Sequence, residues 1–252
     1  MSMTSEIIII PVPGMPEVVE GDEVAALTIA ALRAANIVCV DRDVLVIAQK
    51  IVSKSEGRIV LLDSVAPSLR AREWAQAYGK DARVVEVVLR QSRRIVRMER
   101  GVIICETEHG FVCANAGVDA SNAAEGTVVL LPEDPDASAR RIRLAMERGL
   151  GLRFAVIVAD TFGRPWREGL VNVGLGVSGL APLTDYRGRR DWHGRLLSST
   201  VIALADELAS AAEIVMGKSA GVPVAIIRGV KFEAAEGSGR DMIRPAENDL
   251  FR

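Results

Sequence analysis

The stretch FAVIVADT, residues 154–161, decides the fold class of this chain. Six apolar residues, three of them β-branched, run without interruption into an acid and a hydroxyl group. A short run of this kind is typical of a β-strand, and strand ends are where ligand groups commonly lie. Working outward in both directions, similar runs and stretches of helical periodicity follow one another along the chain. The sequence therefore predicts a protein of mixed α and β structure.

The same patterns predict the other elements. Strands are expected at residues 7–10, 44–48, 58–62, 102–105, 128–131, 154–159 and 222–227. Helices are expected at residues 22–35, 68–78, 82–91, 138–148 and 198–216. We expect Asp136 to cap the fourth helix, with Pro135 blocking its backward extension. The regular alternation of a doubly wound sheet is missing, so the predicted class is α+β, with mixed sheets and flanking helices.

Composition and charge limit the organisation and the partners. The 252 residues are 49% hydrophobic, without a repeat or a low-complexity linker, which predicts a single domain over residues 1–252 with a soft boundary near 149–151. The formal net charge of −2 predicts neither a nucleic-acid nor a membrane partner. No apolar run approaches the roughly 20 residues of a membrane helix, and the first residues lack a secretory signal, so we expect a cytoplasmic protein.

Cysteine and histidine content argues against zinc. Cys39, Cys105 and Cys113 stand in apolar stretches, without a CxxC pair and with two histidines in the chain. We expect buried, reduced thiols. His193 is a poor candidate base, because no acid or nucleophile stands at a diagnostic spacing from it.

A basic segment, AQKIVSKSEG at residues 48–57, follows a predicted strand. Lys50 and Lys54, with Ser53 and Ser55, can hold a polyphosphate through compact charges and hydroxyl donors. A solvated basic loop explains the same residues, because no GxxxxGK[ST] motif is present.

Two further segments each present a carboxylate at the end of a predicted strand: residues 108–122 with Asp119, and residues 158–169 with Asp160. Carboxylates with hydroxyl, amide and water ligands suit Mg²⁺ or Mn²⁺, and substrate phosphates then complete the coordination. An aspartate at a strand end also commonly caps a turn, and this alternative stays open for each of them.

Arginine clusters supply candidate anchors for an anion. Arg164, Arg167 and Glu168 are expected in a rigid loop, where a guanidinium group can hold the planar oxygens of an acidic substrate, unless they form a surface ion pair. The loop at 185–195 is basic and aromatic, and either clamps an anionic or ring-bearing ligand or is a solvated loop. The glycines of residues 215–223 either approach a phosphate or end a helix. Together these segments favour a metal-dependent, phosphate-handling enzyme over a binding module.

Several long segments resemble one known family. The stretches GFVCANAGVDASN (110–122) and ADTFGRPWREG (159–169) are similar to the coenzyme F420-0 gamma-glutamyl ligase family. The resemblance runs nearly from end to end. It also covers VIAQKIVSKSEGR at 46–58, LLPEDPDASARRIR at 130–143, DYRGRRDWHGR at 185–195, ADELASAAEIVMGK at 205–218 and VPVAIIRG at 222–229.

The resemblance implies an amide ligase that uses GTP and a divalent metal ion, Mg²⁺ or Mn²⁺, with K⁺ as a further candidate cofactor. The implied reaction adds L-glutamate to coenzyme F420-0, the precursor of a deazaflavin cofactor, through an acyl phosphate. An intertwined homodimer with two intimately associated subdomains is also implied, and the alanine-rich helix at 198–216 is compatible with such packing.

The resemblance also implies roles for individual residues. Asp119 and Asp160 correspond to metal ligands, with Thr161 on a second metal. The arginine cluster Arg164, Arg167 and Glu168 lies in the same signature, and its substrate-anchoring role is our inference from charge. The positions that match nucleotide contacts are Met15, Pro16, Glu17, Val18, Gln49, Lys50, Lys54, Asn122, Met216, Gly217, Lys218 and Ser219.

Lys218 departs from the family pattern, which has an acidic residue associated with the second metal at this position. A protonated lysine is no metal ligand, so either the second metal uses other oxygens or Lys218 contacts phosphate directly. Two alternative functions follow from the sequence: a nucleotide-dependent carboxylate-amine ligase with another acceptor, and a nucleotide-binding or cofactor-binding protein without turnover.

Overall fold

The computed structural model describes residues 6–121 and 123–250 of the chain. Its largest element is a five-stranded sheet with the strand order β1-β12-β2-β8-β9. Within this sheet β2 and β8 pair in parallel, and all other neighbours are antiparallel. The bounds are β1 (Ile8–Pro11), β12 (Val224–Arg228), β2 (Asp43–Ala48), β8 (Phe154–Arg164) and β9 (Arg167–Ser178). The mixed sheet with its helices confirms the predicted α+β class.

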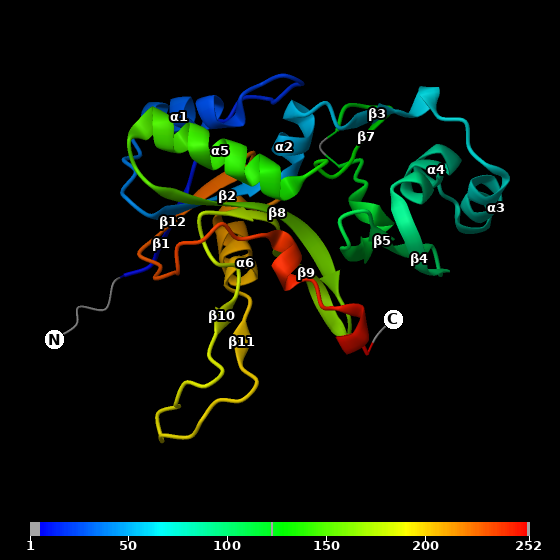
Figure 1. Cartoon of the computed structure of the whole chain (residues 1–252). Coiled ribbons are helices and arrows are strands. Elements are labelled where there is room, and N and C mark those ends of the chain that lie inside the picture. The colour runs from blue at the N-terminus through cyan, green and yellow to red at the C-terminus, as the bar shows by residue number, and fades with distance from the viewer. Residues whose placement is uncertain (1–5, 122, 251–252) are drawn as a thin grey trace.

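Helices cover both faces of this sheet (Figure 1). Leu45 and Ile47 of β2 pack in one core with α1 and α5, whereas Val44 and Val46 pack in a second core with α6. This alternation places successive side chains of a strand on opposite faces. Both faces are buried, which explains the unbroken apolar runs in the sequence. The helix bounds are α1 (Val24–Ala34), α5 (Pro135–Leu150) and α6 (Leu204–Met216).

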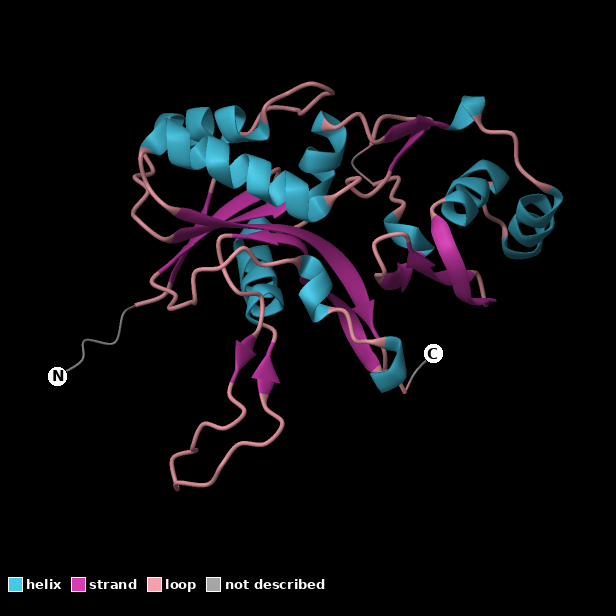
Figure 2. Ribbon diagram, in the orientation of Figure 1, coloured by secondary structure: helices cyan, strands magenta, loops and turns pink. Residues whose placement is uncertain are grey.

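A smaller part of the chain, residues 58–131, lies to one side of the large sheet (Figure 2). It contains two helices, a three-stranded sheet in the order β4-β5-β6 and the two-stranded ribbon β3-β7. Val88, Ile103 and Val128 belong to its buried cluster. The bounds in this part are β3 (Ile59–Leu61), α3 (Leu69–Tyr78), α4 (Ala82–Arg90), β4 (Ser92–Glu99), β5 (Val102–Thr107), β6 (Val112–Ala114) and β7 (Thr127–Val129), with the short 3-10 turns η1 (Leu62–Ser64) and η2 (Asn115–Gly117). Two further 3-10 turns, η3 (Gly239–Met242) and η4 (Ala246–Asn248), lie near the C-terminal end of the described residues.

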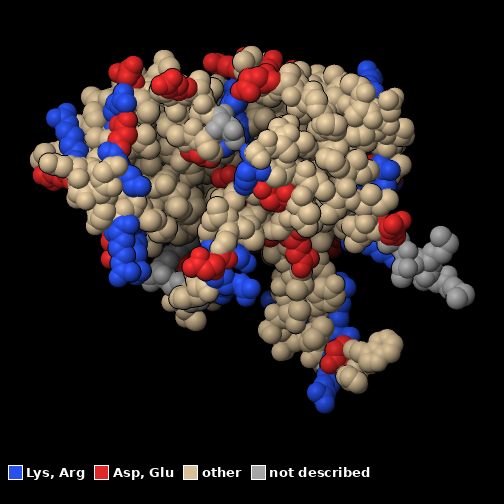
Figure 3. All heavy atoms as spheres, turned by 180° about the vertical axis from the view of Figure 1, so that it is seen from behind, with Lys and Arg blue, Asp and Glu red and all other residues tan. Residues whose placement is uncertain are grey.

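A long hairpin, which we call the arm (residues 184–202), projects away from the sheet. Its base is the short antiparallel pair β10 (Thr184–Asp185) and β11 (Val201–Ile202). Figure 3 shows basic side chains along the arm and near its end. The predicted helix at 198–216 is wrong at its beginning, because residues 201–202 pair as β11 and α6 begins only at Leu204.

Other predictions need correction. The segment after β2, expected as a basic loop, is the helix α2 (Gln49–Ser55), and β4 and β9 were not predicted. β8 continues to Arg164, so the expected rigid loop is the turn of a β8–β9 hairpin. Asp136 is not the cap of α5. The carboxylate of Asp134 caps the helix instead, because it accepts a hydrogen bond from Ala137 N at 3.0 Å. Pro135 occupies the first helical turn, where a backbone N–H would have no partner within the helix and its absence costs nothing.

Three further expectations concern burial and organisation. Cys105 and Cys113 are buried as predicted, whereas Cys39 is only partly buried. None of the described helices is long and apolar enough to span a membrane. Residues 149–151 end α5 and turn into β8, and the soft boundary expected there stays a prediction.

We expect Gly176→Ala to lower the free energy of unfolding by about 1–3 kcal/mol or more. Gly176 of β9 lies against the first turn of α5, and an added Cβ would stand 2.0 Å from the carbonyl oxygen of Pro135. Urea unfolding measures the loss. Gly163→Ala is the matched control in the same hairpin, because its Cβ would meet nothing closer than Leu170 at 3.8 Å. Equal stabilities of the two variants would contradict the close packing of α5 on β9.

Candidate active site

A cavity with a volume of about 900 Å³ opens where β2 ends, beside the middle of β8. These two strands pair in parallel as far as Ala48 opposite Ala159, where β2 ends and β8 continues, so the residues after these two positions lie side by side at this edge of the parallel pair. Gln49 and Lys50 therefore lie across from Asp160 and Thr161. The turn at residues 15–18 and the loop at 216–223 also line the cavity. The crevice beyond the carboxyl ends of parallel strands is a common ligand site.

Asp119 reaches the cavity from the smaller part of the chain. Its Oδ1 accepts a hydrogen bond from Ser121 N at 2.6 Å, and its Oδ2 accepts from Lys50 Nζ at 2.8 Å and from Ser121 Oγ at 2.8 Å. Burial alone would raise the pKa of Asp119, but the hydrogen bond from Lys50 and the one from Ser121 N outweigh it and lower the pKa below its usual range. Asp119 is thus ionised and paired with a lysine.

Asp160 lies near the middle of β8 in a less favourable environment. Burial and, to a smaller degree, the neighbouring charge of Asp119 raise its pKa to about 6, against weaker lowering by the N–H of Thr161 and by Lys50 and Lys218. The ionised form of Asp160 therefore lacks sufficient positive charge around it. A cation bound between Asp119 and Asp160 would supply that charge.

The donor set fits a hard divalent ion. Asp119 and Asp160 offer carboxylate oxygens and Thr161 a hydroxyl, which are ligands that suit Mg²⁺ and Mn²⁺. Among the described residues no group of three or more His, Cys, Asp or Glu side chains gathers around one point. A magnesium or manganese ion at this position would therefore need oxygens from water or from a bound ligand, as is usual where phosphates complete the coordination.

We expect the stabilisation of the protein by Mn²⁺ to depend on pH. Because the pKa of Asp160 is raised on folding to about 6, this group favours the folded state below about pH 4 and loses that contribution as the pH rises through 6. The ion competes with the same proton, so its affinity falls about tenfold for each pH unit below 6. Thermal melting should show a Mn²⁺-induced rise in Tm at pH 7.5 that is clearly smaller at pH 5.

The control for this experiment is the variant Asp160→Asn, which has no proton to lose at this position. Its melting temperature should respond little to Mn²⁺ at either pH. An equal Mn²⁺ effect on the unmodified protein at pH 5 and pH 7.5 would show that Asp160 does not hold the ion.

Helix α2 positions three of the predicted nucleotide contacts. The Nζ of Lys54 donates to Glu17, which ties α2 to the turn at residues 15–18. Gln49 is 1% exposed, and its Oε1 accepts a hydrogen bond from Ser53 Oγ at 2.8 Å. Within the described part of the chain the Nε2 of Gln49 has no hydrogen-bond partner, although the residue lines the cavity. Buried polar groups are nearly always satisfied, so this amide points to a ligand that brings an acceptor oxygen.

Two residues of the site were missed in the sequence, Asn172 and Glu213. The hydroxyl of Thr161 donates to Asn172 Oδ1 at 2.6 Å, and Asn172 Nδ2 donates to Glu213 Oε2 at 2.9 Å. Lys218 contacts the Thr161 hydroxyl and lies 3.4 Å from Glu213 Oε1. Asn172 is a polar residue between Val171 and Val173. Once β9 is known to be a strand, a polar side chain in this apolar stretch indicates a candidate site residue.

Some predicted site residues lie elsewhere. Arg164, Arg167 and Glu168 are at the tip of the β8–β9 hairpin, where Arg164 Nη2 donates to the carbonyl oxygen of Glu168 at 2.6 Å, and they are not among the residues that line the cavity. Their substrate-anchoring role stays a prediction. The arm also lies away from the cavity. Asn122 falls outside the described residues.

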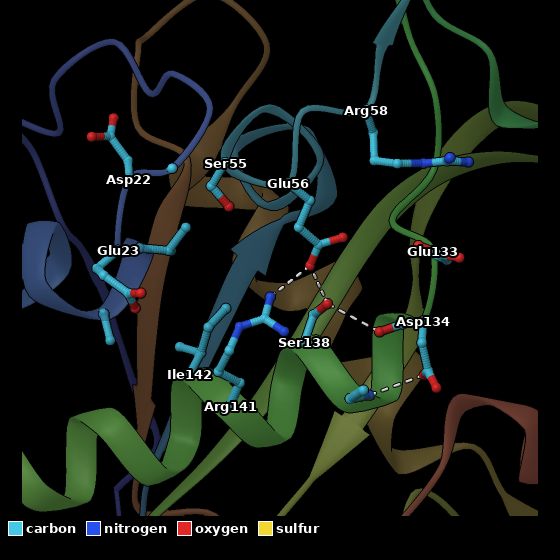
Figure 4. Close-up of a pocket in the computed structure, with 14 residues that line it drawn as sticks. Asp22, Glu23, Ser55, Glu56, Arg58, Glu133, Asp134, Ser138, Arg141 and Ile142 are labelled. Carbon is cyan, nitrogen blue, oxygen red and sulfur yellow. Dashed lines mark hydrogen bonds and ion pairs between the residues drawn. The ribbon is translucent and has the colours of Figure 1, made fainter.

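A second hollow, of about 470 Å³, lies between α1, α5 and the end of α2. Figure 4 shows its central interactions, in which Glu56 accepts hydrogen bonds from Ser138 and Arg141. Asp134 on its rim caps α5. None of the residues that line it has a buried polar atom without a partner. This hollow is thus internally satisfied, in contrast to the cavity around Gln49.

The cavity therefore joins ammonium groups, an unsatisfied amide and two neighbouring carboxylates at one edge of the sheet. This combination suits a phosphate-bearing ligand together with a hard cation. A sequence profile of the F420-0:gamma-glutamyl ligase family matches residues 14–229, which include every group described in the cavity. The chain belongs to this family, and the resemblance noted in the sequence is confirmed.

Individual relatives agree with the family match. The coenzyme F420:L-glutamate ligase of Methanothermobacter thermautotrophicus is 47% identical over 247 residues, which cover 97% of this chain and 98% of that protein. The enzyme of the same name from Methanocaldococcus jannaschii is 48% identical over 213 residues, covering 84% of this chain and 85% of the relative. That of Archaeoglobus fulgidus is 40% identical over 245 residues, covering 97% and 96%.

Proposed function

We propose that this chain is a GTP-dependent ligase that joins L-glutamate to coenzyme F420-0 through an amide bond. The observation that carries the proposal is the cavity at the end of β2, which is lined by Lys50, Lys54, the orphan amide of Gln49 and the carboxylates of Asp119 and Asp160. The names of the relatives supply the substrates, and the family match covers the whole cavity.

The proposed chemistry explains why such a cavity is needed. A carboxylate does not form an amide at neutral pH, so an oxygen of the F420-0 carboxylate first attacks the γ-phosphorus of GTP, and GDP leaves. The amine of glutamate then attacks the carbonyl carbon of the acyl phosphate, loses a proton and releases phosphate. Such transfers depend on positioning and on charge neutralisation rather than on a protein nucleophile.

Each group has a role in this scheme. Lys50 and Lys54 bind phosphate oxygens, and the Nε2 of Gln49 donates to an oxygen of the nucleotide. Asp119 and Asp160 hold Mg²⁺ or Mn²⁺, which when bound neutralises charge on the phosphates. K⁺ is a candidate for a further cofactor and is varied in the assay.

Product analysis by mass spectrometry tests the function. The protein is incubated with F420-0, L-glutamate, GTP and Mn²⁺, and we expect glutamylated product with GDP released in step and neither product in the metal-free control. A panel of other carboxylate acceptors tests the rival ligase. GTP binding without any turnover on this panel would instead identify a binding protein and overturn the proposal.

We also propose that the protein is a homodimer and that the arm contributes to the contact. Trp192 near the arm's end is 96% exposed and Leu196 is 63% exposed, so two large apolar side chains of one projection lie in solvent. The arm carries Arg187, Arg189, Arg190 and Arg195 beside them. Covering these apolar groups is most directly achieved by a second copy of the chain.

Shortening the arm to a tight turn after β10 is expected to convert the dimer into a monomer, as measured by light scattering after gel filtration. Trp192→Ala alone is expected to weaken the dimer about tenfold or more, because exposed aromatic anchors carry much of the energy of such contacts. Leu69→Ala is the control, since Leu69 is also exposed but lies on α3. A monomeric unmodified protein would rule out the homodimer.

A further inference from the structure

Four side chains close a ring beside the two carboxylates of the cavity. Lys218 contacts Thr161, Thr161 donates to Asn172 at 2.6 Å, Asn172 donates to Glu213 at 2.9 Å, and Glu213 lies 3.4 Å from Lys218. β9 places Asn172 directly opposite Thr161 in the antiparallel register, and Asn172 is 3% exposed. Its buried amide therefore fixes the positions of both Thr161 and Glu213.

The hydrogen-bond directions in this ring are determined. A hydroxyl group has one proton, and the hydroxyl of Thr161 uses it to donate a hydrogen bond to the Oδ1 of Asn172. The remaining lone pairs of the Thr161 oxygen therefore face Lys218, whose ammonium group can only donate. Thr161 would hold a metal ion through these lone pairs, and the ammonium group of Lys218 already occupies this side of the oxygen.

Glu213 is engaged in the same way. One of its oxygens accepts from Asn172 Nδ2, and the other pairs with Lys218 Nζ. Thr161 and Glu213 are two oxygen donors on the Asp160 side of the cavity that a further cation could use, and both are turned toward Lys218. A second divalent ion at this point would have to displace Lys218 and would be repelled by its charge.

We propose that Lys218 itself is the second cation of this site, so that the protein binds one divalent ion per chain, on Asp119 and Asp160. The ammonium group, held by Thr161 and Glu213, neutralises phosphate charge at the position where a second metal ion would otherwise act. The role toward phosphate rests on the proposed function, whereas the number of ions does not.

Counting bound Mn²⁺ tests the proposal. The full chain is equilibrated with Mn²⁺ with and without a non-hydrolysable GTP analogue, and bound ions are counted by equilibrium dialysis and by electron paramagnetic resonance. We expect one ion per chain with the spectrum of an isolated ion. Lys218→Glu should bind two ions with the spectrum of a coupled pair, because paired ions in such sites lie about 4 Å apart. Lys80→Glu, an exposed lysine outside the cavity, should bind one.

A second variant separates charge from metal count. Lys218→Met keeps the apolar stem, should still bind one ion, and should bind the GTP analogue about tenfold more weakly because a charge-assisted contact is lost. The side chain of Lys218 is 63% exposed, so neither variant should change the melting temperature in the absence of metal.

Two coupled ions in the unmodified protein, or a single ion in a folded Lys218→Glu variant, would overturn the inference. An unchanged affinity of Lys218→Met for the analogue would overturn the role toward phosphate. These results are independent of turnover: one bound ion without ligase activity would contradict the proposed function alone, and ligase activity with two bound ions would contradict this inference alone.

Discussion

Asp160→Asn is expected to lower kcat/KM for glutamate ligation by at least about a thousandfold while the protein stays folded. Asparagine has nearly the same shape but no negative charge, so it cannot share a divalent ion with Asp119. The buried carboxylate of Asp160 is costly to ionise, as its pKa of about 6 shows. Removing that charge should leave the metal-free melting temperature equal to or above that of the unmodified protein.

Steady-state assays across a range of Mn²⁺ concentrations, together with thermal melting, measure this effect. Asp63→Asn serves as the control, because the Asp63 side chain is 94% exposed and pairs with Arg83 on the smaller part of the chain. The control should keep its activity within about twofold. Near-normal turnover of Asp160→Asn would remove Asp160 from the proposed metal site.

Asp43→Ala is expected to lower the free energy of unfolding by about 3–5 kcal/mol. Asp43 begins β2 and is 1% exposed, and it accepts hydrogen bonds from Arg228 Nε at 2.9 Å and Arg228 Nη2 at 2.8 Å. Its Oδ2 also accepts from Val40 N at 2.9 Å. Alanine would leave the guanidinium group and one backbone N–H without this partner at the junction of β2 and β12.

Asp41→Ala provides a matched comparison two residues away. Asp41 forms a similar pair with Arg153, but both side chains are exposed, and surface pairs contribute about 0–1 kcal/mol. Chemical unfolding of the two variants should therefore differ by several kcal/mol. A similar small loss in both would show that the Asp43–Arg228 pair adds little to the junction of the strands.

The strands of the core were predictable because a strand that is buried on both faces has an unbroken run of apolar residues. β2 and β8 are of this kind. Helix α2 was not recognised, because Gln49, Lys50 and Lys54 face a cavity and break the apolar periodicity of a helix. β9 was hidden by Gly174 and Gly176, of which the close approach of α5 requires the second.

The site likewise contains residues that the sequence predicts and residues that it does not. Predicted strand ends precede Asp119, Asp160, Lys50 and Lys54. The parallel pairing of β2 and β8 brings the last three to one cavity, which Asp119 enters from the smaller part of the chain. Asn172 and Glu213 could not be placed, because their contacts depend on the register of β9 and on where α6 ends. Their neighbours in space are 11 and 41 residues away in the chain.

The position of β12 between β1 and β2 bears on how the chain folds as it is made. Ile8 pairs with Arg228, so β1 can pair only after β12, near the other end of the chain, has been made. While the chain is still leaving the ribosome, β1 has no neighbour and β2 keeps one open edge, and such edges invite association with other chains. Closure of the sheet is therefore a late event, and a chain cut short before Arg228 would expose β2 to other unfinished chains.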